Sequence, residues 1–413
     1  MSPQMTRALI VVRTANRPEI LNRCLTAAVE GCEVAQDAFW LVLDDSSLEN
    51  RPPTQQVVKR WKALGLRVSY VDKAVEEHVA EFLPGPVPRT FFARVTGPSP
   101  SSPTEGRRNF GLIAGLSLKP DVLFFVDDDM VHRHEGNCFF HWCANNRHPG
   151  SFIAAPLRLG IVDMAYLDRL VRLLGRDDWH QFVSEVCISS DLASWYSPKN
   201  PFWEQADAGR GRASTISEKD VVSGGFIALR NNGEAWLPFP GGFNSDINWS
   251  ILQSTCLGTA ILWVSGFSAE HLPPGLVHPG AQSILSEVVG TAITRALLKI
   301  EPGGKSPMNA LAIHLPDLLR IELKQGLLLF MDVERAVLSR LRTGDDGIEA
   351  GRLLSKIRDT LADVAKLLKS VDSRQLAKDW LDDFATRKEM FLELRRNEMV
   401  QSQVRRMVFD DRI

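Results

Sequence analysis

The feature that most constrains the fold is a series of short, almost uninterrupted apolar runs in the first two-thirds of the chain. Each run is bounded by turn residues, and they lie at Ala8 to Val12, Phe39 to Leu43, Leu66 to Val71, Val122 to Val126, Ser151 to Ala155, Val221 to Leu229 and Ala260 to Val264. Strands that are buried on both faces read as continuous apolar runs, as in parallel sheets. Between the first two runs, Pro18 to Ala35 carries apolar residues at helical spacing. The pattern predicts an α/β fold with a mostly parallel sheet flanked by helices.

The last third of the chain has a different pattern. From about Pro279 onward, long helical patterns replace the short runs. Apolar residues then recur three and four positions apart, the spacing of a helix that packs along a partner helix, at Leu354, Ile357, Leu361, Val364, Leu368 and Val371. We predict two units, an α/β domain over residues 1–280 and a C-terminal helical domain over 281–413. The proline- and serine-rich segment 84–103 is predicted to be a loop.

Composition excludes some classes of protein. A net charge of −2 creates no field that would gather nucleic acid, so we expect no nucleic-acid partner. We find no apolar stretch long enough for a transmembrane segment. The six cysteines are scattered without a CxxC pair, which favours reduced, mostly buried thiols. These features predict a cytoplasmic protein without disulfides, although docking on a membrane through an amphipathic helix stays open.

The strongest chemical signal is the segment DVLFFVDDDM. Its strand, Val122 to Val126, delivers three carboxylates at its carboxyl end, Asp127, Asp128 and Asp129. Adjacent acids repel one another, so a fold gathers them mainly where a cation or a positive partner offsets the charge. Along an extended backbone, Asp127 and Asp129 point to the same side and Asp128 faces away. A metal site is the favoured interpretation, and a solvated acidic turn is the alternative.

These residues resemble a known family. The strand that ends in DDD is similar to the DxD motif of glycosyltransferases with the GT-A fold, a Rossmann-like α/β fold. Other segments resemble the DxD-containing, family 2-like members in the same order, namely VVRTANRPEILNRCL, FWLVLDDSS, EGRRNFGLIAG, VVSGGFIALRN and FPGGFNSDINWS. The resemblance covers roughly Arg7 to His278. It implies a donor that is a UDP- or GDP-sugar and a Mn²⁺ or Mg²⁺ cofactor.

The resemblance also implies a set of residues that bind the nucleotide sugar. They are Thr14, Asn16, Arg17, Asp44, Asp45, Arg107, Arg108, Asn109, Asp127, Gly224 and Gly225. Most follow strand ends, where open α/β sheets bind ligands, and glycines allow close approach of a sugar to the backbone. Turns and helix caps would explain the Asp and Ser positions, and a bulge would explain the glycines, without any function. Which of the two arginines points inward stays open.

The metal ligands and the catalytic base come from the same resemblance. Asp127, Asp129 and a late histidine, His271, are the predicted ligands, with His278 as the competing histidine. Asp246 is the predicted general base that takes the proton of the acceptor hydroxyl, and a helix cap is its alternative role. Usual members carry an acid where this chain has Ser245, which leaves the identity of the base open.

The resulting hypothesis is a metal-dependent glycosyltransferase of the hexosyltransferase type that inverts the anomeric centre. The alternatives are a retaining glycosyltransferase, a sugar-phosphate nucleotidyltransferase and a non-catalytic nucleotide-sugar or carbohydrate-binding module. The loop RTANRP contains no glycine, which counts against the nucleotidyltransferase. The sequence does not identify the acceptor. The helical region matches nothing in the family core and could close over the acceptor, pair two copies of the chain as a homodimer or dock on a membrane.

Overall fold

The computed structural model describes residues 7–83, 103–133, 138–146, 151–160, 216–218, 225–230, 236–241, 245–271, 281–300, 307–343 and 348–409. The loop expected at 84–103 lies outside these ranges except for Pro103, which begins a helix. Gly224 and His278 also lie outside them.

The described strands form one nine-stranded mixed sheet in the order β3-β2-β1-β4-β8-β6-β9-β5, with β7 paired to β9. Their bounds are β1 Ala8–Thr14, β2 Phe39–Asp44, β3 Val68–Val71, β4 Val122–Asp127, β5 Met130–Arg133, β6 Phe152–Gly160, β7 Ile216–Glu218, β8 Phe226–Arg230 and β9 Ala260–His271. The pairs among β3, β2, β1 and β4 are parallel, as is β6 with β9, whereas β8, β5 and β7 run antiparallel to their neighbours. The predicted mostly parallel α/β sheet is therefore confirmed, and each apolar run contains or overlaps a strand.

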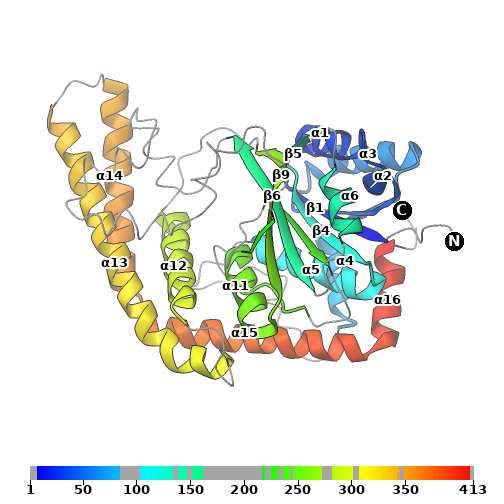
Figure 1. Ribbon diagram of the computed structural model, residues 1–413. Coiled ribbons are helices and arrows are strands. Elements are labelled where there is room, and N and C mark those ends of the chain that lie inside the picture. The colour runs from blue at the N-terminus through cyan, green and yellow to red at the C-terminus, as the bar shows by residue number, and fades with distance from the viewer. Residues whose placement is uncertain are drawn as a thin grey trace.

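Helices cover both faces of this sheet (Figure 1). One face packs against α1 (Pro18–Val29), α2 (Glu33–Asp37), α3 (Arg51–Ala63) and α6 (Phe139–Asn145). The other packs against α4 (Lys73–Ala80) and α5 (Pro103–Leu118). The helix expected over Pro18 to Ala35 is two helices, because Gly31 adopts a positive φ of 84° between them. Only glycine takes that conformation readily.

The C-terminal helices begin beyond α11 (Ser245–Leu257), and they divide their packing between two cores. The apolar faces of α12 (Ala281–Leu298), α13 (Pro307–Thr343) and α14 (Ile348–Lys369) build one cluster of buried residues with α11. On α14, the predicted seam residues Leu361, Val364 and Leu368 are buried in that cluster. The seam of α14 thus packs against helices of the same chain.

The last two helices return to the sheet. The first half of α15 (Ser373–Arg396) packs in the helical cluster through Trp380 and Phe384, whereas its second half packs in the sheet core through Phe391 and Leu394. Figure 1 shows α15 running from the helices α12 to α14 back to the sheet, where α16 (Glu398–Phe409, red) follows. Helix α16 packs against α5, α4 and β3. The sheet core therefore contains residues from both ends of the chain.

The expectation of disulfide-free thiols is wrong for one pair. Cys32 and Cys138 form a disulfide, with Cα atoms 6.1 Å apart and a sequence separation of 106. Each residue immediately precedes a short helix, and α2 packs against α6, which brings the two thiols together. Cys24, Cys143 and Cys256 are free. None of the helices in the described ranges combines the length and the apolarity that a bilayer crossing needs.

Candidate functional site

The polar strand ends predicted from the sequence meet at one edge of the sheet. In the register of the three central strands, Thr14 lies opposite Asp44, and Arg13 lies opposite Asp127. All three strands are parallel, so their carboxyl ends share the edge at which open α/β sheets bind ligands. The candidate site consists of the side chains that leave this edge.

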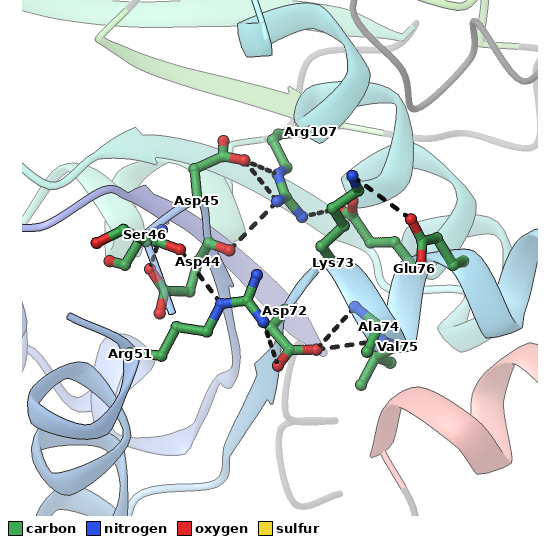
Figure 2. A network of polar contacts seen from close by, with 12 residues as sticks. Asp44, Asp45, Ser46, Arg51, Asp72, Lys73, Ala74, Val75, Glu76 and Arg107 are labelled. Carbon is green, nitrogen blue, oxygen red and sulfur yellow. Dashed lines mark hydrogen bonds and ion pairs between the residues drawn. The ribbon is translucent and has the colours of Figure 1, made fainter. Parts of the chain in front are cut away.

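Arg107, on α5, joins two carboxylates from different elements. Its guanidinium donates to Asp45, with Nη2 2.5 Å from Oδ1, and pairs with Glu76 of α4 (Figure 2). Arg107 and Glu76 are buried, and burial raises the pKa of Glu76 to about 7 although the Arg107 charge opposes the shift. We call Asp45, Glu76 and Arg107 the Arg107 cluster. It fixes the turn after β2 against α4 and α5.

Two of the predicted nucleotide-binding residues are used inside the fold. Asp44 is fully buried, and its carboxylate accepts hydrogen bonds from the Ser46 N–H and the Tyr70 hydroxyl. Asn109 exchanges two hydrogen bonds with the backbone of Phe239. The Asp44 carboxylate and the Asn109 amide thus have hydrogen-bond partners within the protein. Asp45 is the acid after β2 that reaches the surface, and we do not assign ligand binding to Asp44 or Asn109.

The turn after β1 is braced against the turn after β2. Asn16 has a positive φ of 56°, a conformation that asparagine tolerates better than most residues. Its backbone N–H donates to Ser46 Oγ, and its side-chain oxygen accepts from the Ser47 N–H. Asn16 therefore shapes the edge of the site.

The three acids contact different arginines: Asp128 and Asp129 contact Arg17, whereas Asp127 contacts Arg13 and Arg108. Strand β4 ends at Asp127, and residues 128 and 129 form a turn, so the extended alternation assumed for them stops there. Asp128 is buried and accepts hydrogen bonds from Thr14 Oγ1 at 2.6 Å and from Arg17 at 2.5 Å. Burial raises the pKa of Asp128 to about 7, and the charge of Arg17 opposes the shift. Asp129 contacts the same Arg17 at 3.3 Å. Arg17 and Thr14 therefore bind the side chains of the acid turn formed by residues 128 and 129.

Arg108, the neighbour of Arg107, bridges the acid turn and the predicted base. Its two terminal nitrogens lie 3.8 Å from Asp127 Oδ2 and 3.8 Å from Asp246 Oδ1. Asp127 also lies 3.3 Å from Arg13. The Asp127 and Asp246 side chains keep 22% and 16% of their surface exposed, whereas Arg108 keeps 8%. We call Asp127, Arg108 and Asp246 the Arg108 cluster; its two carboxylates are the partly exposed members.

The position of Asp246 depends on the segment 236–241 that precedes α11. Phe239 stacks on Trp249 of α11 with ring centroids 4.3 Å apart, and its carbonyl accepts from Asn109 of α5. From α15, Arg387 donates to the Phe239 carbonyl and Trp380 donates to the Gly241 carbonyl. Helices α5 and α15 thus hold the start of α11, where Asp246 lies in the first turn.

Gly225 and His271 complete the neighbourhood of the acids. The Gly225 carbonyl accepts from the Asp127 N–H at 2.7 Å, and a Cβ on Gly225 would lie 2.7 Å from the Met130 sulfur. The register of β5 and β9 sets His271 opposite Met130, the residue after Asp129. The backbone therefore brings the predicted histidine ligand close to the acid turn.

Sequence reasoning missed three residues of the site. Arg13 ends an apolar strand and could have been recognised as a charge at a strand end. Glu76 and Tyr70 lie on α4 and β3, away from any motif, and nothing in the sequence indicates their partners. Their roles follow only from the packing of α4 and β3 beside the β2 turn.

The acids fit a divalent cation that takes most of its ligands from a substrate. Carboxylate oxygens suit Mg²⁺ and Mn²⁺, and the Asp127 side chain keeps 22% of its surface exposed. Within the described residues, no group of three His, Cys, Asp or Glu side chains is arranged to hold a metal. Magnesium commonly binds through one or two carboxylates plus substrate phosphates and water.

Comparisons with known proteins give distant structural similarities. No protein-family model and no curated protein matches the sequence. The chain is similar to the mannosyltransferase PcManGT of Pyrobaculum calidifontis in complex with GDP-Man and Mn²⁺, with 11% identity over 94% of this chain and 88% of that chain, and a TM-score of 0.42. It is similar to glucosyl-3-phosphoglycerate synthase of Mycobacterium tuberculosis in complex with Mg²⁺ and UDP, with 14% identity, coverage of 71% and 78%, and a TM-score of 0.36.

GalNAc-T7 with UDP, GalNAc and Mn²⁺ is a third similar structure, with 11% identity over 76% of this chain and 55% of that chain, and a TM-score of 0.39. All three are glycosyltransferases with the GT-A fold, the family that the sequence motifs resemble. Similarities this distant assign no activity, and the chemistry of the site comes from its own side chains.

Proposed function

We propose that the protein is a metal-dependent glycosyltransferase that moves a sugar from a UDP- or GDP-sugar to an acceptor hydroxyl. The observation that carries the proposal is Arg108, which faces Asp127 at the strand end and Asp246 on α11 at 3.8 Å each. A transferase needs an anion-binding charge, a metal-binding acid and a base within the reach of one sugar. The Arg108 cluster provides these three groups from three separate elements.

The donor would bind across the edge formed by β1, β2 and β4. Asp45 carries a carboxylate that can accept a hydrogen bond from a nucleobase N–H. Arg13 and Arg108 offer guanidinium groups to the diphosphate, and Asp127 and Asp129 would hold Mg²⁺ or Mn²⁺, with His271 as a further ligand. When bound, the cation stabilises the negative charge that develops on the departing diphosphate.

The transfer step would use Asp246 as the general base. Asp246 removes the proton from the acceptor hydroxyl as the acceptor oxygen forms a bond to the anomeric carbon. The bond from that carbon to the diphosphate oxygen breaks, and its electron pair leaves with the nucleoside diphosphate. Attack from the face opposite the leaving group inverts the anomeric centre. The Arg108 guanidinium, 3.8 Å from Asp246, would keep this carboxylate close to the diphosphate.

A donor panel tests the proposal. The protein is incubated with UDP- and GDP-sugars, with MnCl₂, MgCl₂ or a chelator, and release of nucleoside diphosphate is followed. We expect one donor to be hydrolysed slowly, and only with metal. Binding of donors without turnover in any condition, even with candidate acceptors present, would instead favour a carbohydrate-binding module.

The variant Asp246→Asn tests the base. We expect transfer to fall by about 10²- to 10⁴-fold, the usual contribution of a general base, while the Kd of the donor changes little. Asp317→Asn, on the exposed surface of α13, is the matched control and should keep full activity. Equal losses of donor binding and of transfer in Asp246→Asn would give Asp246 a structural role.

A further inference from the structure

A groove runs along the open edge of the sheet, away from the candidate site. Its volume is about 680 Å³, and strand β3 forms its floor. Val58 of α3 lines one wall, and Val75 of α4 and Val408 of α16 line the other. Because α3 covers one face of the sheet and α4 and α16 cover the other, the groove lies where both layers stop short of the edge.

The backbone on this edge is oriented to accept another strand. Among the described strands, β3 pairs only with β2. The Trp40 N–H donates to the Arg67 carbonyl at 2.8 Å, which directs the backbone groups of Arg67 and Ser69 toward β2. The N–H and C=O groups of a strand alternate in direction, so those of Val68 and Tyr70 point to the groove. An edge strand that pairs with a neighbour on one side only is a template for strand addition.

The rim of the groove is positively charged. Lys59 and Lys62 near the end of α3 and Arg406 of α16 are exposed along it. The fourth basic residue, His78 of α4, lies 3.4 Å from Glu81. The residues that line the groove include no Asp or Glu in the part of the chain that the structure describes. A ligand that complements the groove therefore carries negative charge and apolar groups together.

We propose that this groove binds an extended acidic peptide segment of another protein, which adds a strand to β3. The four residues of β3 span about 13 Å, enough for about four residues of an added strand. Backbone hydrogen bonds to Val68 and Tyr70 would give affinity, and the apolar walls and cationic rim would select alternating apolar and acidic side chains. A second copy of this chain is a poor occupant, because two such rims would bring like charges together.

Fluorescence anisotropy with synthetic peptides tests the proposal on the full chain. The probe is a labelled peptide of alternating Glu and Val, and its partner is the same peptide with every backbone nitrogen methylated, which keeps the charge but lacks the donors for strand pairing. We expect the unmethylated peptide to bind about tenfold more tightly or better. Equal binding of the two peptides would overturn strand addition. A preference for vesicles of anionic phospholipid over the unmethylated peptide would also overturn it.

Charge reversal tests the location. The double variant Lys59→Glu, Lys62→Glu should weaken peptide binding by about tenfold or more, since two attractive charges become repulsive. Lys366→Glu, Lys369→Glu on the exposed side of α14 changes the net charge equally and should leave the affinity unchanged. Equal losses in both double variants would show a general electrostatic effect and contradict the groove. Circular dichroism confirms that both variants fold.

Discussion

The Arg107 and Arg108 clusters use consecutive arginines of one helix in opposite ways. Arg107 makes short contacts with Asp45 and Glu76, and Glu76 is buried with it. Arg108 makes contacts of 3.8 Å with two carboxylates that stay partly exposed. Closely paired buried charges stabilise a fold against their removal, whereas the partly exposed carboxylates of Asp127 and Asp246 keep surface for a ligand. The difference separates the residues that build the site from those that we expect to perform the chemistry.

The largest expected effect comes from removing the metal-binding acid of the Arg108 cluster. Asp127→Asn should lower kcat/KM by about 10³-fold, comparable to the loss of a charge-stabilising group in other enzymes. The melting temperature should move by less than about 2 °C, because the Asp127 carboxylate is partly exposed to solvent. Steady-state kinetics and thermal melting measure the two quantities. Activity near that of the unmodified protein would contradict a catalytic role for the Arg108 cluster.

The Arg107 cluster should show the reverse pattern. Arg107→Met leaves Glu76 without its buried partner, which should cost about 3–5 kcal/mol in the free energy of unfolding. Denaturant titration measures this loss. Adding Glu76→Leu to Arg107→Met should recover much of it, because the orphaned carboxylate is removed. Arg108→Met is the matched control, with a smaller loss of stability and a larger loss of activity. Equal stabilities of the two single variants would contradict the distinction.

The pH dependence of stability sharpens the same comparison. Burial raises the pKa of Glu76 from 4.5 to about 7 in the folded protein. Between these pH values the folded state holds a proton that the unfolded state has lost. Glu76 therefore contributes stability below pH 4.5, and this contribution is lost as the pH rises to 7. The stability difference between the unmodified protein and Glu76→Gln should therefore fall with pH by up to about 1.4 kcal/mol per unit. Urea titrations at several pH values measure it, and a flat difference would contradict the raised pKa.

The smallest predicted effect concerns Asp44, the buried acid next to Asp45 of the Arg107 cluster. Tyr70→Phe removes the hydroxyl that donates to Asp44 at 2.6 Å and should cost about 1 kcal/mol of stability. Donor affinity should not change, because Asp44 faces the interior. A tenfold loss of donor binding in Tyr70→Phe would return Asp44 to the set of ligand-binding residues.

The strands and the edge at which the site lies were predictable from the sequence. The apolar runs are almost uninterrupted, and parallel strands must bring their carboxyl ends to a common edge, so Thr14 and Asp127 were expected near each other. The ion-pair partners of the two arginines on α5 were not predictable. Arg107 and Arg108 are adjacent in the sequence, and only the packing of α4 and α11 against α5 determines that one meets Glu76 and the other Asp246.

The sequence also did not predict the long-range contacts. The Cys32–Cys138 disulfide depends on the packing of α2 against α6, which no spacing of cysteines indicates. The C-terminal helical pattern gave the right type of structure and the seam on α14. It gave no sign that α15 would hold the start of α11 through Trp380 and Arg387, because those contacts join segments about 140 residues apart.

The return of α16 to the sheet has a consequence for synthesis of the protein. Val400, Val404 and Val408 belong to the same core as Leu9 and Leu41 of the first two strands. While the chain leaves the ribosome, the apolar face that these valines cover stays open until residue 408 has emerged. The apolar face of the early strands therefore stays uncovered until α16 has been synthesised, and we expect chaperones that shield nascent apolar surface to engage this chain until then.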